Sequence, residues 1–336
     1  PTTQGWKGAS SSAWRQGQRL SKQPLADHVV QSLQIRRLCH ETITALAGKM
    51  PHPPGIIPGG VTGLLADSTI ADLVGIAGKI TTFIDGAYAE DIAALSEDFA
   101  DYAEIGVSGA AYLSFGAFSL DDGSLFLPKG YLEPNSSSAV AFDPSQISES
   151  TAHAKFGLDN GGHPSRGRTD PSMDRVDAYS WIKAARLAGK PCEVGPVART
   201  AIAGQPLGRG VLGRHQARQK EASRLIQAMK VWLSKLSVNE SGLPVFPNVP
   251  ISGEGQGLVE GPRGCLGHWL TIENAVIAHY GVVTPTTWNA SPRDDQGEPG
   301  PMEQAMQGVS VANANDPIEV VRVVHSFDPC LQCAVH

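Results

Sequence analysis

The sequence predicts an α+β fold that is predominantly helical, with long ordered loops and a small antiparallel sheet. Apolar residues recur at helical spacing in several stretches, which indicates helices that share a core. The 37 glycines and 24 prolines among 336 residues exceed the average share of about 12% and gather in connecting stretches. One segment near the C-terminus alternates between apolar and polar residues around a turn, as antiparallel hairpins do.

The predicted helices follow from the spacing of apolar residues. The first covers residues 25–47, and Gly48 is its expected C-cap. A second apolar stripe runs over residues 73–84 and leads into a more acidic stretch at 89–103, which predicts a bent pair of helices. A third helix is expected over about residues 217–236. Core packing is the expected role of all these stripes.

The remaining chain predicts loops, one hairpin and one short helix. Residues 137–199 show little periodicity and much Gly, Pro, Asp, Ser and His, which is typical of a long irregular excursion. Residues 268–288 predict a hairpin around Glu273-Asn274-Ala275. The last helix is expected near residues 301–307. We expect a polar N-terminal arm at residues 1–22 and a single domain over residues 23–336.

Charge and hydropathy exclude some partners. There are 27 basic and 33 acidic side chains, and no run of five like charges, so neither nucleic acid nor an anionic membrane is an expected partner. The sequence has neither an apolar run of membrane-spanning length nor a signal-peptide core. We therefore do not expect the chain to enter a membrane itself, and Pro1 suggests a processed product. Five sparse cysteines argue against a disulfide framework.

The sharpest feature is the C-terminal sequence DPCLQCAVH, in which Cys330 and Cys333 can direct two sulfurs at one atom. Such a pair is half a zinc site, a redox dithiol or without function. A thioredoxin-type dithiol needs a strand before the motif and a helix after it, and three residues after Cys333 are too few for that helix. A structural zinc site needs a second ligand pair, which the sequence lacks.

DPCLQCAVH resembles the C-terminal signature of nickel-iron hydrogenase large subunits, whose mature form ends at the histidine. Further motifs resemble the family in the same order: IRRLCHETITALAGKMPHPPG, AYSWIKAARLAGKPCEVGPVAR, GRHQAR, GPRGCLGHW and TPTTWNASPRDDQG. Together they span roughly residues 30–336. Several look most similar to the selenium-containing branch, in which selenocysteine stands at the position of Cys330. The resemblance implies a hydrogenase large-subunit-like helical bundle.

The resemblance implies reversible heterolytic cleavage of dihydrogen at a nickel-iron centre, with electrons passed to iron-sulfur clusters in a small subunit. Soft thiolates suit such metals. Cys330 would be a terminal nickel ligand and first proton acceptor, and Cys333 would bridge nickel to an iron that carries carbon monoxide and cyanide. His336 would ligate magnesium or a similar divalent ion, whose shell the carbonyl of Val282 would complete. No organic cofactor is implied.

The resemblance also assigns the surroundings of the centre. Pro262 and Arg263 match the family residues over the metals, with Asp328 as the carboxylate that holds the arginine. Pro285, Thr286 and Leu266 would line the pocket of the diatomic ligands. Structural roles are expected for other family-typical or unpaired residues, namely His40, Glu193, His215, His268, Cys39, Cys192 and Cys265.

The family builds its nickel site from four thiolates, and this sequence lacks the early Arg-x-Cys-Gly-x-Cys motif that supplies two of them. Also absent are the early proton-relay glutamate and the acidic magnesium ligand. The large subunit is then either split between two polypeptides or cleaved after synthesis, and in both cases we expect a second polypeptide to carry the first cysteine pair. The alternatives are a non-catalytic hydrogenase-like scaffold subunit and, more weakly, a zinc-binding interaction protein. A periplasmic or membrane-associated location through a partner is favoured over a free cytoplasmic one.

Overall fold

The structure is a computed structural model that describes residues 24–58, 60–63, 65–236, 248 and 250–334. The chain forms two compact units, each described here by itself. One unit comprises Pro1–Asp98 and Gln219–Val249, and the other comprises Phe99–Arg218 and Pro250–His336. The expected arm at residues 1–22 lies outside the described residues, and the single domain over residues 23–336 stays a prediction.

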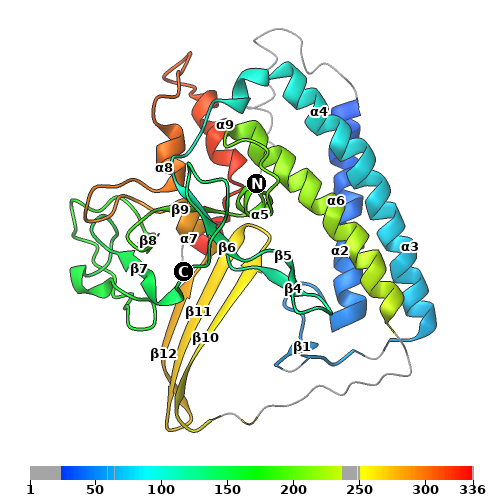
Figure 1. Cartoon of the computed structure of the whole chain (residues 1–336), viewed down its shortest axis with the longest axis horizontal. Helices are drawn as coiled ribbons and strands as arrows, with labels where there is room; N and C mark the ends of the chain where they lie inside the picture. Colours follow the sequence, from blue (N-terminus) through cyan, green and yellow to red (C-terminus); the bar gives the residue numbers. More distant parts are fainter. Residues whose placement is uncertain (1–23, 59, 64, 237–247, 249, 335–336) are drawn as a thin grey trace. The chain divides into compact units, whose positions relative to one another are not determined.

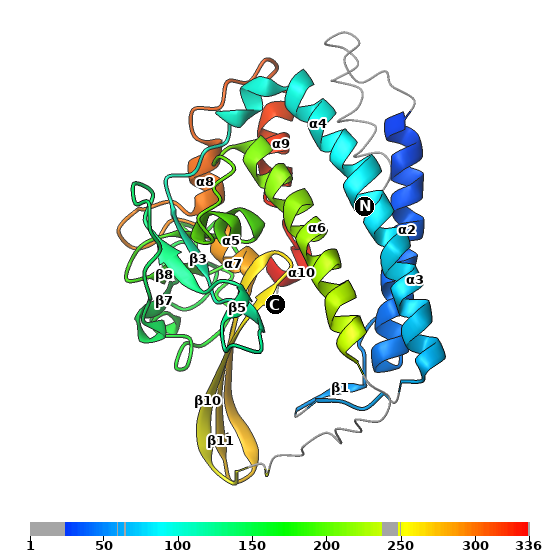
Figure 2. The same ribbon diagram turned by 45° about the vertical axis from the view of Figure 1, so that its right-hand side comes forward.

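The first unit is built from long helices: α2 (Pro24–Ala47), α3 (Asp67–Phe83), α4 (Ala89–Asp98) and the later part of α6 (Val211–Lys235). In Figures 1 and 2, α2 and α3 run side by side. Its core is a cluster of buried aliphatic side chains from α3 and α6, namely Leu73, Ala77, Ile80, Ile226 and Leu233. A short ribbon of β1 (Ile56–Ile57) and β2 (Gly60–Val61) follows α2. None of the helices within the described ranges is long and apolar enough to cross a membrane.

The predicted helices of this unit are confirmed, including the bend. Gly48 takes a φ of 92° and its N–H donates to the carbonyl of Thr44, as a C-cap glycine does. Between α3 and α4 lies the π-helical turn η1 (Ile84–Tyr88). Such a turn widens the helix, and the side chain of Gln219 donates to the carbonyl of Ile84 at 3.2 Å.

The second unit combines short helices with several small sheets, so the expectation of a single small antiparallel sheet is wrong for the described residues. One sheet has the order β6 (Gly130–Leu132), β3 (Ala111–Ser114), β9 (Cys192–Val194), and its β3–β9 pair is parallel. Two further pairs are β4 (Ala117–Ser119) with β5 (Leu125–Leu127) and β7 (Ile147–Ser150) with β8 (Ala184–Leu187). Single 3₁₀ turns are η2 (Ala100–Ala103), η3 (Pro144–Gln146) and η4 (Leu158–Asn160).

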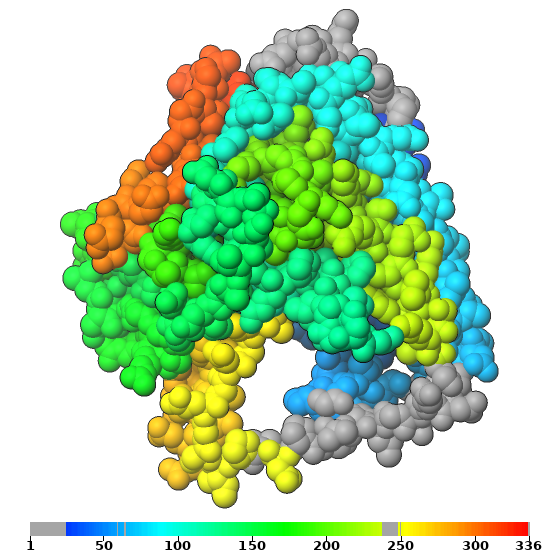
Figure 3. Space-filling view, viewed as in Figure 1, coloured from blue at the N-terminus to red at the C-terminus, as the bar shows by residue number. Residues whose placement is uncertain are grey.

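The largest sheet is the meander β10 (Gly253–Gly261), β11 (Gly264–Glu273) and β12 (Val276–Val283). The predicted hairpin is confirmed, with Asn274 and Ala275 at positive φ in its turn. The outer ends of these strands, yellow in Figure 3, project beyond the rest of this unit. The hairpin ends earlier than predicted, because Thr284 caps the helix α7 (Pro285–Asn289).

The C-terminal part holds more helix than predicted. Helix α8 (Pro301–Met306) is confirmed, but it is not the last, because α9 (Ile318–Ser326) and α10 (Leu331–Ala334) follow it. The sequence of α9, IEVVRVVHS, is rich in β-branched residues and favours a strand locally. Val323 is fully buried on its inner face, so tertiary packing overrides that preference. Helix α5 (Pro196–Ile202) follows β9 directly.

The core of the second unit lies where β11, β12, α7 and the small sheets meet. Trp288 of α7 is fully buried and its ring meets Phe115 edge-on, with centroids 6.4 Å apart. A second cluster joins the start of α6 to α8 and α9 through Val211, Met302 and Val323. These two clusters fix α7, which contacts the terminal cysteines, and the end of α9, which directly precedes them in the chain.

The helical core of the first unit gives a stability prediction. Leu73 is 1% exposed and its neighbour Val74 is 44% exposed on the same helix. Leu73→Ala removes buried methyl groups and leaves a cavity, so we expect the free energy of unfolding to fall by about 2–5 kcal/mol. Val74→Ala is the matched control and should change it by less than about 0.5 kcal/mol. Denaturant unfolding of the full chain measures both, and equal losses would contradict the assigned core.

Candidate functional site

Helix α7 holds the terminal Cys-x-x-Cys segment. The backbone N–H of Cys330 donates to the hydroxyl of Thr286 at 3.1 Å, and the hydroxyl of Thr284 donates to the carbonyl of Cys333 at 2.9 Å. Thr284 is also the N-cap of α7, and Thr286 is buried at 3% exposure. The two threonines therefore fix both ends of the segment on a buried element.

The sulfur atoms of the pair converge. The S–H of Cys333 donates to the sulfur of Cys330, with the two atoms 2.7 Å apart. This hydrogen bond, with the charge of Arg263 as a smaller contribution, lowers the pKa of Cys330 below its usual value. Burial and the neighbouring sulfur raise the pKa of Cys333 to about 11. As the pH rises, Cys330 therefore loses its proton before Cys333 does.

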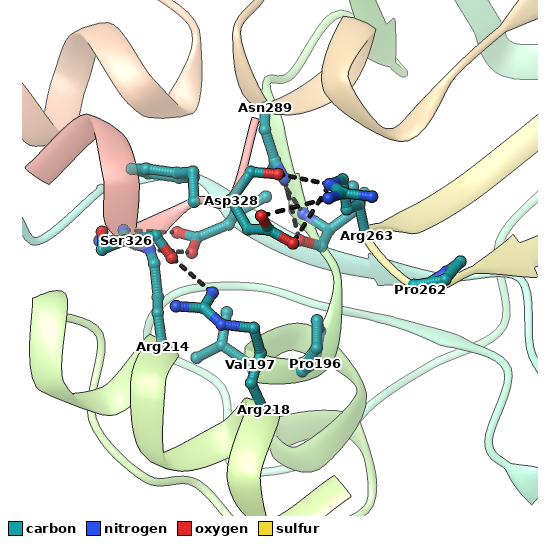
Figure 4. A pocket seen from close by; sticks show the side chains of 12 residues that line it. Pro196, Val197, Arg214, Arg218, Pro262, Arg263, Asn289, Ser326 and Asp328 are labelled. Atoms are coloured by element: carbon teal, nitrogen blue, oxygen red, sulfur yellow. Dashed lines mark hydrogen bonds and ion pairs between the residues drawn. The ribbon is translucent and has the colours of Figure 1, made fainter. Parts of the chain in front are cut away.

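The side chain of Arg263 binds Asp328. Arg263 lies in the two-residue turn between β10 and β11, where Gly261 pairs with Gly264. Its Nε donates to the carbonyl of Asp328 at 2.6 Å, and its Nη2 donates to the carboxylate at 3.2 Å. Figure 4 shows the guanidinium directed at this residue. The expected pairing of Arg263 with Asp328 is present.

Beneath this pair lies a small cavity of about 20 Å³, room for about one water molecule. Its walls come from β9, α5, α6, α7, the turn between β10 and β11 and the end of α9, and they include Glu193. Figure 4 shows Pro196, Arg214, Arg218, Asn289 and Ser326 among the lining side chains. Asn289 exchanges two hydrogen bonds with the backbone of Val194, at 2.9 and 3.1 Å. The side chain of Asn289 is therefore fixed by the backbone of β9.

The other predicted site residues lie on the elements around this pair. Pro285 and Thr286 open α7, and both are buried. Pro262 precedes Arg263 in the turn and is exposed, whereas Leu266 is half-buried on β11. His336 lies outside the described residues.

Val282 lines a second cavity, of about 480 Å³, together with Glu149, Lys183 and Thr287. The amino group of Lys183 lies 3.5 Å from the carboxylate of Glu149, and the side chains are 7% and 8% exposed. Buried ionisable groups in a polar cavity are candidates for ligand contacts. No local pattern in the sequence distinguishes Glu149 or Lys183 from ordinary surface charges.

Structural roles are visible for several family-typical residues. Glu193 is fully buried and pairs with Arg214 at 2.7 Å. Burial and then Arg218 lower the pKa of His215 to about 4, so its ring is neutral at pH 7. His268 lies 2.7 Å from the hydroxyl of Tyr280 on the meander. Cys192 and Cys265 are buried core thiols, and Cys39 packs half-buried against the helical core, as does the neighbouring stretch around His40.

Comparison with known proteins decides the family. The model of the nickel-dependent hydrogenase family matches residues 19–208 and 207–336, nearly the whole chain. The chain belongs to the nickel-dependent hydrogenase family. A curated relative is the periplasmic [NiFeSe] hydrogenase large subunit of Desulfomicrobium baculatum, 33% identical over 91% of this chain and 65% of the relative. Another is the quinone-reactive Ni/Fe-hydrogenase large chain of Wolinella succinogenes, 29% identical over 92% of this chain and 63% of the relative.

The fold agrees with the hydrogenase family. The structure of the Ni-Fe-Se hydrogenase from D. vulgaris Hildenborough in the reduced state superposes with a TM-score of 0.88 at 31% identity, covering 94% of this chain and 72% of that one. The chain thus has the fold of that hydrogenase chain, with helices and small sheets. It spans less than two thirds of the length of the curated hydrogenase relatives.

The donor set within the hydrogenase chain fits a metal centre only in part. Cys330 and Cys333 converge, and sulfur is a ligand type that suits nickel and iron. In the ranges that the structure describes, no cluster of three or more His, Cys, Asp and Glu side chains could hold a metal ion. Two sulfurs alone leave a metal open, so donors from elsewhere are required.

Several residues that shape the site were missed from the sequence. Thr284 was placed in the hairpin, although Thr-Pro at the start of a helix is a known signal for an N-cap followed by proline at N1. Arg199, Arg214 and Arg218 were not singled out, because a lone arginine in a sequence is more often a surface charge. Only the fold shows that they are close to the Arg263–Asp328 pair.

The asymmetry between the two thiols is testable in the reduced, metal-free chain. Because its pKa is lowered, Cys330 carries more thiolate at pH 8 than Cys333, and should react with iodoacetamide at least about tenfold faster. Peptide mapping by mass spectrometry measures both rates. The buried thiols Cys192 and Cys265 are internal controls and should stay unmodified until the chain unfolds. Equal rates for Cys330 and Cys333 would contradict the described geometry.

Proposed function

We propose that this chain is the catalytic part of a hydrogenase that cleaves and forms dihydrogen, with electrons passed to an iron-sulfur small subunit. The observation that carries the proposal is the convergence of two sulfurs beside an arginine–carboxylate pair in a chain of this family. A nickel-iron centre, when bound, supplies heterolytic cleavage of dihydrogen. The residues of the chain bind the metals, accept a proton and exclude other reactions.

Cys330 and Cys333 are the proposed metal ligands. Cys330 would be a ligand of the nickel-iron centre and would accept the proton at its sulfur, in keeping with its lowered pKa. Cys333 would be a second sulfur ligand of the same centre. The position of Cys330 is also where selenocysteine stands in the selenium-containing branch, to which the [NiFeSe] relatives point. Two further thiolates would come from outside these 336 residues, on a second polypeptide.

Four residues would surround the diatomic ligands of iron. Thr286 already binds the backbone of Cys330 through its hydroxyl, so it lies next to the proposed centre. Pro285 precedes it on α7, and Pro262 precedes Arg263 in the facing turn. Leu266 would supply apolar surface toward carbon monoxide, while polar N–H or O–H groups would face cyanide.

A divalent ion such as magnesium would lie by Val282. The supporting observation is the polar cavity that Val282 shares with the carboxylate of Glu149. Oxygen donors suit magnesium. The imidazole of His336 would be a further ligand of this ion, as the resemblance to the family implies.

Arg263 and Asp328 would act next to the metals without binding them. The guanidinium is fixed by two hydrogen bonds to one residue, so it presents a planar positive charge toward the proposed centre at little reorganisation cost.

The relatives named periplasmic and quinone-reactive support a periplasmic or membrane-associated complex, in which the partner subunit provides the contact with the membrane.

The decisive experiment is an infrared spectrum of the purified native complex, recorded where metal-bound carbon monoxide and cyanide absorb, with metal analysis of the same sample. We expect both kinds of band and nickel and iron in equal amounts. Zinc without such bands would overturn the proposed centre. A complex in which no polypeptide carries a further cysteine pair would refute the second-polypeptide assignment.

Cys330→Ala should abolish hydrogen turnover, because it removes a proposed ligand and the first proton acceptor together. The fold should be retained, since Cys330 is half-buried and its backbone N–H still reaches Thr286. Hydrogen-dependent dye reduction and circular dichroism measure the two properties. Cys39→Ala is the matched control, because Cys39 packs in the other unit, and it should leave turnover unchanged. Turnover retained by Cys330→Ala would refute the ligand assignment.

Arg263→Lys should keep the metal content but slow turnover roughly tenfold or more, because an ammonium group cannot reproduce the planar fork. Its matched control is Arg293→Lys, since Arg293 binds the backbone of its own loop at an exposed position. Metal analysis and initial rates are measured on the same preparations. An unchanged rate for Arg263→Lys would reduce Arg263 to a structural role.

A further inference from the structure

A buried arginine, Arg199, binds the backbone of the turn that contains Arg263. Arg199 on α5 is 2% exposed and forms an ion pair with the equally buried Glu260. Its guanidinium also donates to the carbonyl oxygens of Gly261 at 3.3 Å and Pro262 at 3.0 Å. These two residues directly precede Arg263, so Arg199 fixes the backbone from which Arg263 extends.

Asp328 is held in the same manner from the other side (Figure 4). Arg218 on α6 donates from Nη1 to the carbonyl of Ser326 at 2.6 Å, and Arg214 donates to the Ser326 hydroxyl at 3.2 Å. The guanidinium of Arg214 also stacks on the ring of Phe327, 3.7 Å from its centroid. Ser326 and Phe327 directly precede Asp328, so these contacts fix the backbone that leads into it.

The conformation of Asp328 needs such support. Its φ is 52°, in the left-handed region that costs energy for a residue with a side chain. In this conformation, both its carbonyl and its carboxylate face Arg263. If the end of α9 were released, the backbone could relax and turn one of these acceptors away.

The network uses properties that only arginine has. A guanidinium offers five N–H groups in a rigid plane, so it can pair with a carboxylate or contact a ring and still bind backbone carbonyls. Glu193 compensates the charge of Arg214, and the neutral ring of His215 lies 2.8 Å from Arg218. Lysine would keep the charge at either position but lose the second directed contact.

We propose that Arg199 and Arg218 are positioning residues for the Arg263–Asp328 pair. Arg199 sets the backbone of the arginine and Arg218 that of the aspartate, and neither contacts the terminal sulfurs in the described structure. This inference rests on the proposed hydrogenase function. The rate of hydrogen turnover would then depend on two arginines that do not contact the terminal sulfurs.

The test is a double-mutant cycle on the intact complex. Arg199→Lys and Arg218→Lys should each lower kcat about tenfold at unchanged KM, because misplacement of a fixed group affects the reacting geometry. In an Asp328→Asn background, each substitution should lower kcat by less than about a further threefold, because the Arg263–Asp328 pair is already broken. Ser326→Ala removes only the hydroxyl that Arg214 binds and keeps the carbonyl that Arg218 binds, so it should leave kcat within about threefold of the wild-type value.

The matched control is Arg186→Lys. Arg186 is also a buried arginine, paired with Asp294 at 2.7 Å and bound to the carbonyls of Pro292 and Glu298. It should lower the melting temperature as much as Arg199→Lys does, with kcat unchanged. The second measurement is a crystal structure of Arg218→Lys, in which the Arg263 Nε to Asp328 carbonyl distance should open from 2.6 Å to beyond about 3.5 Å.

Several outcomes would overturn the inference. These are an unchanged kcat in Arg199→Lys and Arg218→Lys, a loss of kcat in Ser326→Ala as large as that in Arg218→Lys, effects that multiply with Asp328→Asn, or an equal loss of kcat in Arg186→Lys. A wild-type complex without hydrogen turnover would instead refute the proposed function. The Arg263–Asp328 distance in the variant crystal structure would still test the positioning in that case.

Discussion

The hydrogen bonds between α7 and the Cys330–Cys333 segment are the contacts on which the site depends. A one-turn helix such as α10 has no stability of its own, because helix nucleation is unfavourable and one turn adds too few hydrogen bonds to offset it. The position of the two sulfurs is therefore set from outside α10, by Thr284 and Thr286. Those threonines are in turn fixed by the buried ring of Trp288, so the hydrophobic core and the sulfur pair form one continuous structure.

In the loop-rich second unit, buried arginines donate hydrogen bonds to backbone carbonyl oxygens that lie outside helices and sheets. Irregular backbone leaves carbonyl oxygens without the partners that helices and sheets provide, and such groups are costly when buried. Arg175 alone donates to the carbonyls of Thr151, Ala152, Ala154 and Phe156. Arg186, Arg199 and Arg214 each combine a buried carboxylate with further acceptors. The long excursion over residues 137–199 is thus ordered by charged side chains as well as by apolar contacts.

The sequence predicted what local patterns determine. Helix α2 with Gly48 and the turn at Asn274 follow from spacing and turn chemistry. The pairing of Arg263 with Asp328 was implied only by the resemblance to the hydrogenase family. Strand β10 was missed because its sequence, GEGQGLVEG, contains too much glycine to show alternation. Helix α9 was missed because its β-branched residues favour a strand until Val323 is buried. The roles of Arg199 and Arg218 depend on contacts across 61 to 108 positions of the chain, which no local pattern contains.

The contacts that fix the sulfur pair and the Arg263–Asp328 pair all lie within one unit of this chain and involve protein groups alone. Half of the proposed centre is therefore organised before any further ligand is added. When a metal or partner meets flexible donors, ordering them consumes part of the binding free energy. Here that cost was met during folding of the second unit, so the missing donors need only approach a site whose geometry already exists. This lowers the free-energy cost of completing the proposed centre, whichever part of the protein supplies the remaining donors.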